Sequence, residues 1–388
     1  MKTMNWSILV GLATVLAAPP ALAQDALKIG LTGALTGPVA GTYAPAVEGL
    51  RLYIDRLNKA GGVNGRQIEL LLQDDASEPS RAAANAKRFL TQDGVVMLLN
   101  ASLSSTYAPT IAEAKRAGVP LLFTAAACPP EVFPPADPNL FCTTAFGTEY
   151  DSRAALNFIK ETAGTEVKIG FQAMAIPVSR GEIDYAENLA KGMGMTSVAK
   201  EITPPPAPDY SPFASNISSA GAEWVWSWAP WGSQIKTFEA LRRLGWEGNY
   251  LAWAHLEAES ELERVKDPGF YVLGANALFA EDLPVMQEIT DAAQAAGAEY
   301  PANQMTEGWI AGMVIEAALA SAEDPGSADS VREAMSGLSV DTKGLRGGSL
   351  EWTEENHFRT QQHYKVYRWN PESEGIETVS GWTTFDVE

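Results

Sequence analysis

The sequence is poor in the residues and motifs on which most enzymes depend. It contains only three histidines among 388 residues, and His255, His357 and His363 show no spacing typical of metal ligands. We find no Gly-x-Ser-x-Gly elbow, no His-Glu-x-x-His pair, no phosphate-binding Gly-x-x-x-x-Gly-Lys loop and no cysteine–histidine couple. The sequence therefore favours a protein that is not an enzyme and uses no cofactor and no metal. An exported hydrolase is the alternative.

Basic residues are also scarce. The chain has 28 lysines and arginines against 48 aspartates and glutamates, a formal net charge of −20 at pH 7. The acidic residues are scattered rather than gathered in one tail, as is typical of a protein whose charge keeps it soluble. Because this charge repels nucleic acid and anionic lipid surfaces, we expect neither as a partner.

The longest apolar run lies at the amino terminus. It covers residues 8–18, follows Lys2 and precedes the small-x-small pattern of residues 21–23. These are the three parts of a secretory signal peptide, and we expect cleavage after Ala23 and a periplasmic mature protein. The run is shorter than the roughly 20 residues of a transmembrane helix, so we expect no direct membrane insertion. An uncleaved anchor is the alternative.

The sequence has only two cysteines, Cys128 and Cys142, which lie 14 positions apart. An even pair in an oxidising compartment predicts a disulfide. Prolines between them predict a stiff, irregular loop. Closing a loop of about 15 residues is worth roughly 3 kcal/mol in the chain-entropy model. The disulfide would therefore hold a segment that neither helix nor strand stabilises.

Short apolar runs alternate with amphipathic helical patterns along the rest of the chain. The alternation occurs as two sets, one on either side of the loop between the cysteines, which predicts two lobes. Strand–helix–strand units predict an α/β fold in which each lobe is a mostly parallel sheet flanked by helices. The predicted strands are residues 27–31, 68–72, 95–99, 119–123, 167–171, 223–228 and 250–253, with a strand-rich end at 345–387; the predicted helices are one that ends at Gly61 and residues 79–93, 106–117, 149–163, 182–193, 232–244, 284–296, 303–322 and 328–336.

The loops that follow the strands are expected to line a cleft between the two lobes. In open parallel sheets these loops face a crevice, and helix N-termini there offer free N–H groups. The loops concerned are residues 32–42, 100–106, 124–128, 173–181 and 228–233.

Several segments of the first half carry a family resemblance. They are LTGALTGPVA at 31–40, GGVNGRQIEL at 61–70, the pairs Asp74-Asp75 and Glu78-Pro79, and AGVP at 117–120. With them the chain resembles the periplasmic substrate-binding proteins of ABC transporters, in the family that binds branched-chain amino acids and amides.

The resemblance implies a two-lobed type I periplasmic-binding fold with three interlobe crossovers. We place the crossovers near residues 144–148, 274–276 and 350–365. The N-terminal lobe would then comprise residues 24–146 plus 275–350, and the C-terminal lobe residues 147–274 plus 351–388.

The resemblance also implies a function. A monomer would capture a small-molecule solute in the cleft, close by hinge motion and deliver the solute to an inner-membrane ABC permease. A sensor that reports its ligand to a receptor is the alternative.

In the first lobe the resemblance implies a hydroxyl loop for a ligand carboxylate. Ser104, Ser105 and Thr106 inherit this role, although Ser105 or Thr106 could instead cap the following helix. Ala125 and Ala127 match the loop that supplies backbone groups, and Ala127 stands where the family usually has threonine or serine.

In the second lobe the chain departs from the amino-acid binders. Those proteins present an acid near the position of Ala254 or His255 for the α-ammonium, whereas the nearest acid here is Glu257. An ammonium left unpaired in a closed cleft is costly. We therefore expect an organic carboxylate with an aromatic or apolar body, with a branched-chain amino acid or amide as the alternative.

Aromatic side chains are the remaining candidates for ligand contact. Trp224 and Trp226 share one strand face with Trp228 and are expected in the core. We expect ligand contacts from four of the aromatic residues: Tyr43, Tyr150, Trp228 and Trp231. Two further candidates are Arg180, a loop arginine that could instead be solvated, and His255, which stands at the position of the family's acid.

Overall fold

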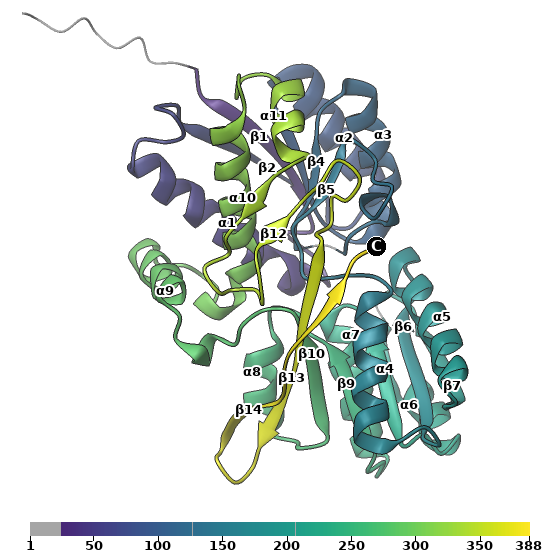
Figure 1. The fold of residues 1–388 in the computed structure, drawn as a ribbon. Helices are drawn as coiled ribbons and strands as arrows, with labels where there is room; N and C mark the ends of the chain where they lie inside the picture. The colour runs from purple at the N-terminus through teal and green to yellow at the C-terminus, as the bar shows by residue number, and fades with distance from the viewer. Residues whose placement is uncertain (1–24, 126, 206) are drawn as a thin grey trace, which may run out of the picture.

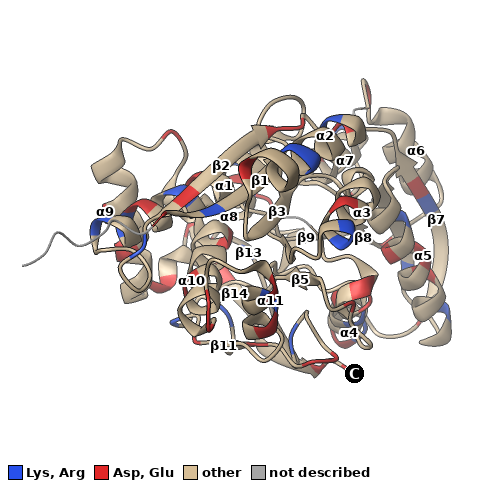
Figure 2. Ribbon diagram, turned by 90° about the horizontal axis from the view of Figure 1, so that it is seen from above, with Lys and Arg blue, Asp and Glu red and all other residues tan. Residues whose placement is uncertain are grey.

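Two separate sheets organise the chain into two lobes (Figure 1). The computed structural model describes residues 25–125, 127–205 and 207–388. The predicted signal peptide, residues 1–23, lies outside the described residues. Within them no helix is both long and apolar enough to cross a membrane. Acidic residues occur along the elements of both lobes (Figure 2).

The first sheet has five parallel strands in the order β2-β1-β3-β4-β5. The predicted positions of the first four strands are confirmed to within a few residues, whereas β5 was not predicted from the sequence. The strands are β1 (Leu27–Gly33), β2 (Ile68–Asp74), β3 (Met97–Ala101), β4 (Leu121–Phe123) and β5 (Leu140–Cys142), and the helices of this lobe are α1 (Ala40–Lys59), α2 (Pro79–Arg88), α3 (Tyr107–Ala117), α9 (Pro284–Ala296), α10 (Thr306–Ser321) and α11 (Ala328–Met335).

Helix α10 packs closely along α1 in this lobe. A Cβ at Gly308 would lie 1.7 Å from the carbonyl oxygen of Ala46, so only glycine allows the two helices to approach this far. Trp309, the next residue, meets Tyr53 edge to face at 5.0 Å. The core of the first lobe therefore includes the helix layer as well as the sheet.

The second sheet has seven strands in the order β14-β13-β10-β9-β8-β6-β7. Strands β6 to β10 are parallel, and β13 and β14 add an antiparallel edge. The elements are β6 (Lys168–Met174), β7 (Thr196–Thr203), β8 (Trp224–Trp228), β9 (Asn249–Trp253), β10 (Phe270–Gly274), β13 (Gln361–Asn370) and β14 (Gly375–Asp386), with α4 (Tyr150–Ala163), α5 (Pro177–Gly192), α6 (Ser211–Ser219), α7 (Trp231–Arg243) and α8 (Ala258–Val265).

The chain passes between the lobes three times. It leaves β5 for α4, leaves β10 for α9, and leaves the short pair β11 (Ser339–Val340) and β12 (Leu350–Glu351) for β13. The passages run side by side at the waist of the molecule (Figure 1). The lobe boundaries given above stay a prediction.

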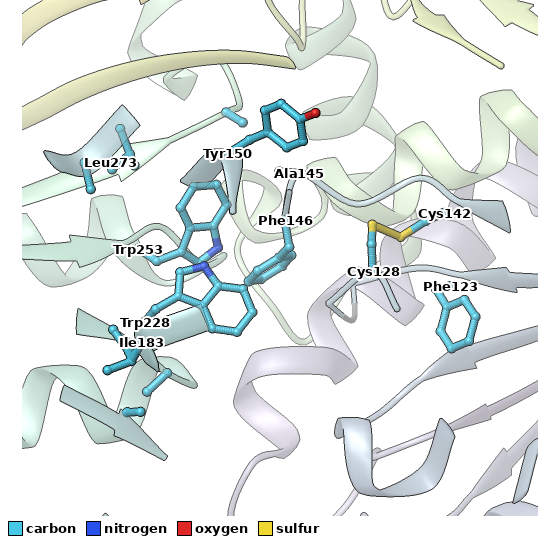
Figure 3. Packing of buried hydrophobic residues seen from close by; sticks show 14 of the residues in the cluster. Phe123, Cys128, Cys142, Ala145, Phe146, Tyr150, Ile183, Trp228, Trp253 and Leu273 are labelled. Carbon is cyan, nitrogen blue, oxygen red and sulfur yellow. A yellow bond between two sulfur atoms is a disulfide. The ribbon is translucent and has the colours of Figure 1, made fainter. Parts of the chain in front are cut away.

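The predicted disulfide is confirmed. Cys128 and Cys142 are bonded, with their Cα atoms 5.7 Å apart. The segment between them holds one 3₁₀ turn, Pro130–Val132, before β5 begins. The bond thus fixes this irregular loop beside the first crossover, where Figure 3 shows it near Ala145 and Phe146.

Candidate ligand-binding site

A narrow cavity lies between the lobes, at the place where two-lobed binding proteins take their ligands. We call it the aromatic chamber. Both lobes contribute to its lining, which comprises Tyr43, Ser104, Tyr107, Ala125, Ala127, Phe146, Ile176, Val178, Trp228, Ala229, Pro230 and His255. The structure thus brings together Tyr43, Ser104, Ala125, Ala127, Trp228 and His255 from the residues predicted by sequence.

Ser104 lies where the two lobes touch. It follows β3 in a 3₁₀ turn that leads into α3, and its Oγ accepts a hydrogen bond of 3.4 Å from the Val178 N–H in the first turn of α5. The N-termini of α3 and α5 therefore approach the same hydroxyl. Free N–H groups and the positive ends of two helix dipoles favour an anion at this point.

Thr106 has a different role from the one predicted. Its hydroxyl donates to the carbonyl of Leu103 at 2.8 Å and accepts from Asn100 Nδ2 at 3.1 Å. The side chain is fully buried beneath the turn, so it orders the turn rather than offering its hydroxyl to the cleft. Ser105 lies half-buried beside it. Thr106 occupies the residue before α3, but its side chain makes no capping hydrogen bond to the helix.

Tyr43 and Tyr107 form one wall of the chamber. Both are buried, and burial raises the pKa of each phenol, so both hydroxyls keep their protons. The hydroxyl of Tyr107 donates to the carbonyl of Ala127 at 2.6 Å, while its ring packs on Phe123 at 4.7 Å. Tyr107 was missed in the sequence, where it resembles an ordinary core residue of a helix.

Phe146 and Trp228 form the opposite wall. Their rings meet edge to face at 5.9 Å (Figure 3). The Trp228 indole N–H donates to Asp151 Oδ2 at 2.8 Å, which fixes the ring orientation. Phe146 comes from the first crossover and was also missed, because no local pattern shows that a crossover residue faces a cleft.

Trp231 lies one layer behind the chamber, contrary to the prediction. Its ring meets Phe270 at 5.9 Å within the second-lobe core, among Ile235 and Phe238. Trp231 is the first residue of α7, and the helical period places it on the same buried face as those two residues. The aromatic ring therefore serves packing.

His255 adds a neutral acceptor to the lining. Its Nε2 lies 2.9 Å from the carbonyl oxygen of Ala229, and since a carbonyl only accepts, Nε2 carries the proton. Burial lowers the pKa of His255 to about 4. At neutral pH the ring is uncharged, and Nδ1 is left as an acceptor.

Glu257 faces the first lobe across the cleft. Its Oε1 accepts a hydrogen bond of 3.4 Å from the Thr42 hydroxyl, whereas its Oε2 is buried with no partner in the described part of the chain. Burial raises the pKa of Glu257 to about 8. By sequence this acid could take the family's role only with a shifted alignment, and in the structure the turn before α8 brings it to the lobe contact.

The family model described as periplasmic binding protein matches residues 26–375. The chain belongs to this family. A leucine-, isoleucine-, valine-, threonine- and alanine-binding protein of Pseudomonas aeruginosa is 28% identical over 212 residues, 53% of this chain and 54% of that protein. The Leu/Ile/Val-binding protein BraC3 of Rhizobium johnstonii is 27% identical over 226 residues, 58% and 59% of the two chains. The chain thus spans little more than half the length of these curated relatives.

Solved structures confirm the two-lobed type I periplasmic-binding fold. A branched-chain amino acid ABC transporter protein from Thermus thermophilus with bound valine has a TM-score of 0.79 at 17% identity, covering 93% of this chain and 96% of that one. A solute-binding protein of Rhodopseudomonas palustris BisB5 in complex with 3,4-dihydroxybenzoic acid has a TM-score of 0.79 at 17% identity, covering 94% and 98%. At these identities the likeness concerns the fold.

A second, polar cavity adjoins the aromatic chamber in this periplasmic binding protein. The two cavities share Ala125, Phe146 and His255. Glu259 lines the polar cavity, and burial raises its pKa to about 7. Its other polar lining residues are Thr42, Asn276, Asn303, Thr306 and Glu307. This side of the site is rich in acceptors, and in residues 25–125, 127–205 and 207–388 we find no His, Cys, Asp and Glu group arranged to hold a metal ion.

Tyr150 and Arg180 lie outside the aromatic chamber. Tyr150 lines an outer groove, which shares Ser104 and Val178 with the chamber, and its ring stacks on Phe133 at 6.2 Å. Arg180 is exposed on α5, so the solvated alternative describes it.

Proposed function

We propose that this protein is a periplasmic solute-binding protein of an ABC importer, without enzymatic activity. The observation that carries the proposal is a chamber between the lobes whose lining comes from both of them. Such a chamber opens and closes as the lobes move about the three crossovers. Ligand binding would stabilise the closed form, and a permease in the inner membrane would recognise that form. Capture, closure and docking need only the monomer.

The ligand that fits the chamber best is an organic carboxylate with an aromatic or apolar body. Ser104 and the N-termini of α3 and α5 offer donors to a carboxylate. Apolar and aromatic groups cover the remaining walls, among them Phe146 and Trp228. The aromatic acid in the Rhodopseudomonas palustris structure is a ligand of the same class on the same fold.

A branched-chain amino acid is the second candidate, and Glu257 favours it. The unpartnered, buried Oε2 of this side chain could receive an α-ammonium from a ligand whose carboxylate lies at Ser104. The names of the curated relatives point the same way. In this case the ammonium would ionise Glu257, because a nearby positive charge lowers the pKa of a carboxyl group.

Calorimetry on parent and variant separates the two ligands. Benzoate-type acids, leucine, isoleucine and valine are titrated into the parent and into Glu257→Gln, with Glu263→Gln on the exposed face of α8 as the matched control. We expect benzoate-type acids to bind and Glu257→Gln to leave their affinity within a few-fold of the parent. Tight leucine binding that Glu257→Gln abolishes, with the acids silent, would reject the aromatic acid and establish the amino acid. A receptor that binds the loaded protein, where no permease does, would favour the sensor.

A further inference from the structure

Two buried arginines hold the first crossover at the hinge. Arg346 donates from Nη2 to the carbonyl of Thr143 at 2.9 Å, and Arg359 donates from Nη2 to the carbonyl of Thr144. Arg346 and Arg359 are only 5% and 3% exposed. They come from the segments before and after β12, in the third passage between the lobes, and bond to the first passage.

The charges of these arginines are incompletely matched. Glu307 pairs with Arg346 at 3.0 Å, whereas Arg359 bonds through its other end to the neutral Gln362 at 2.8 Å. Burial, followed by the charge of Arg346, lowers the pKa of Arg359. The nearby Asp151 is occupied by hydrogen bonds from Trp228 and Tyr364. A buried guanidinium without a counter-charge is costly.

Three guanidinium nitrogens of the pair also lack acceptors. Arg346 Nε, Arg346 Nη1 and Arg359 Nε are buried and have no hydrogen-bond partner in the described part of the chain. Buried charged donors are almost always satisfied in native proteins. Their geometry therefore calls for an acceptor, preferably one that carries negative charge.

A small cavity lies against both arginines. Its lining also includes Gly348, Ser349, Gln362 and His363. Ser349 is exposed, so the cavity communicates with solvent. The free space in it is about that of one water molecule, so only a small ion would fit. His363 adds no competing positive charge at neutral pH, since burial and the two arginines lower its pKa.

We propose that this hinge cavity binds a single small inorganic anion of the size of chloride, which bridges Arg346 and Arg359. The ion would supply the missing acceptor and counter-charge and tie the segments around β12 to the first crossover. The site is separate from the aromatic chamber and independent of the solute that the chamber takes.

Thermal unfolding in sodium chloride tests the proposal, with gluconate replacing chloride at constant ionic strength. Gluconate is too large for the cavity, so we expect chloride and bromide to raise Tm saturably by about 2 °C or more above the gluconate value. Equal Tm values in chloride and gluconate would overturn the proposal, because a water molecule would then suffice in the cavity.

A variant with a carboxylate at the cavity provides a comparison with the chloride-bound parent. Ser349→Asp places a carboxylate at the mouth of the cavity, and we expect it to raise Tm in gluconate and to lose the response to chloride. Ser373→Asp, in the exposed turn between β13 and β14, should keep the parental response. Crystals grown in bromide should show an anomalous peak between the two guanidinium groups. A chloride response that Ser349→Asp leaves intact, together with no bromide peak, would contradict the site.

Discussion

Replacing Ser104 by alanine tests the carboxylate position most sharply. Ser104 is buried at the lobe contact, between the N-termini of α3 and α5. A hydrogen bond to a charged group contributes about 1.5–3 kcal/mol, so Ser104→Ala should raise the Kd of the ligand roughly 10- to 150-fold. The only contact of the hydroxyl in the described structure is the 3.4 Å bond from Val178, so the free energy of unfolding should change little.

Isothermal titration of an aromatic acid and its amide provides the assay. The parent should bind the acid much more tightly than the amide, and Ser104→Ala should remove most of that difference. Ser105→Ala is the control, because this half-buried neighbour keeps the turn and should change Kd less than about threefold. An unchanged Kd in Ser104→Ala, or an equal loss in Ser105→Ala, would refute the carboxylate position.

Three further predictions concern the disulfide, the cleft acid and the tryptophans. Thiol labelling of denatured, unreduced protein should find Cys128 and Cys142 blocked, whereas two labelled thiols per chain would contradict the bond; its removal should cost about 3 kcal/mol. In the closed form burial raises the pKa of Glu257 from 4.5 to about 8. Between these values the unfolded state binds fewer protons, so the stability of protein closed on an aromatic acid should fall as pH rises from about 5 to 8. Glu257→Gln should flatten this part of the pH profile, and an unchanged slope would show that other groups cause it. Ligand should quench tryptophan fluorescence less in Trp228→Phe than in the parent, and Trp231→Phe should keep the quench; the reverse pattern would place Trp231 in the site.

The sequence predicts the parallel part of the fold because its signal is local. Apolar runs mark β1 to β4, and helical spacing marks α1, α9 and α11. Two of the missed elements, β7 and α6, lack such signals. Strand β7 has the sequence TSVAKEIT and is part-exposed along most of its length, as an edge strand allows, so no continuous apolar run reveals it. Helix α6 is built from SPFASNISS, which contains few strong helix formers.

The site is predictable only in part because its geometry depends on how the lobes meet. Ser104 could be proposed from its loop, since a loop after a parallel strand faces the cleft. Phe146 and Glu257 could not, because a crossover and a lobe contact bring them there. The prediction that Trp231 contacts the ligand is wrong for a different reason. Trp231 is the first residue of α7, and a shift of one residue along a helix decides whether a ring faces the cleft or the core. Its position after a strand does not reveal which of the two it faces.

Small-angle X-ray scattering of the mature protein with and without ligand measures directly whether the lobes close on the ligand. In the structure the lobes touch through Ser104 and Val178, and through Thr42 and Glu257, as expected of a closed form. We expect a larger radius of gyration without ligand and a decrease on saturation to the value of this structure. Mass spectrometry should recover the ligand chemically intact. A radius of gyration that saturating ligand leaves unchanged would contradict capture by closure.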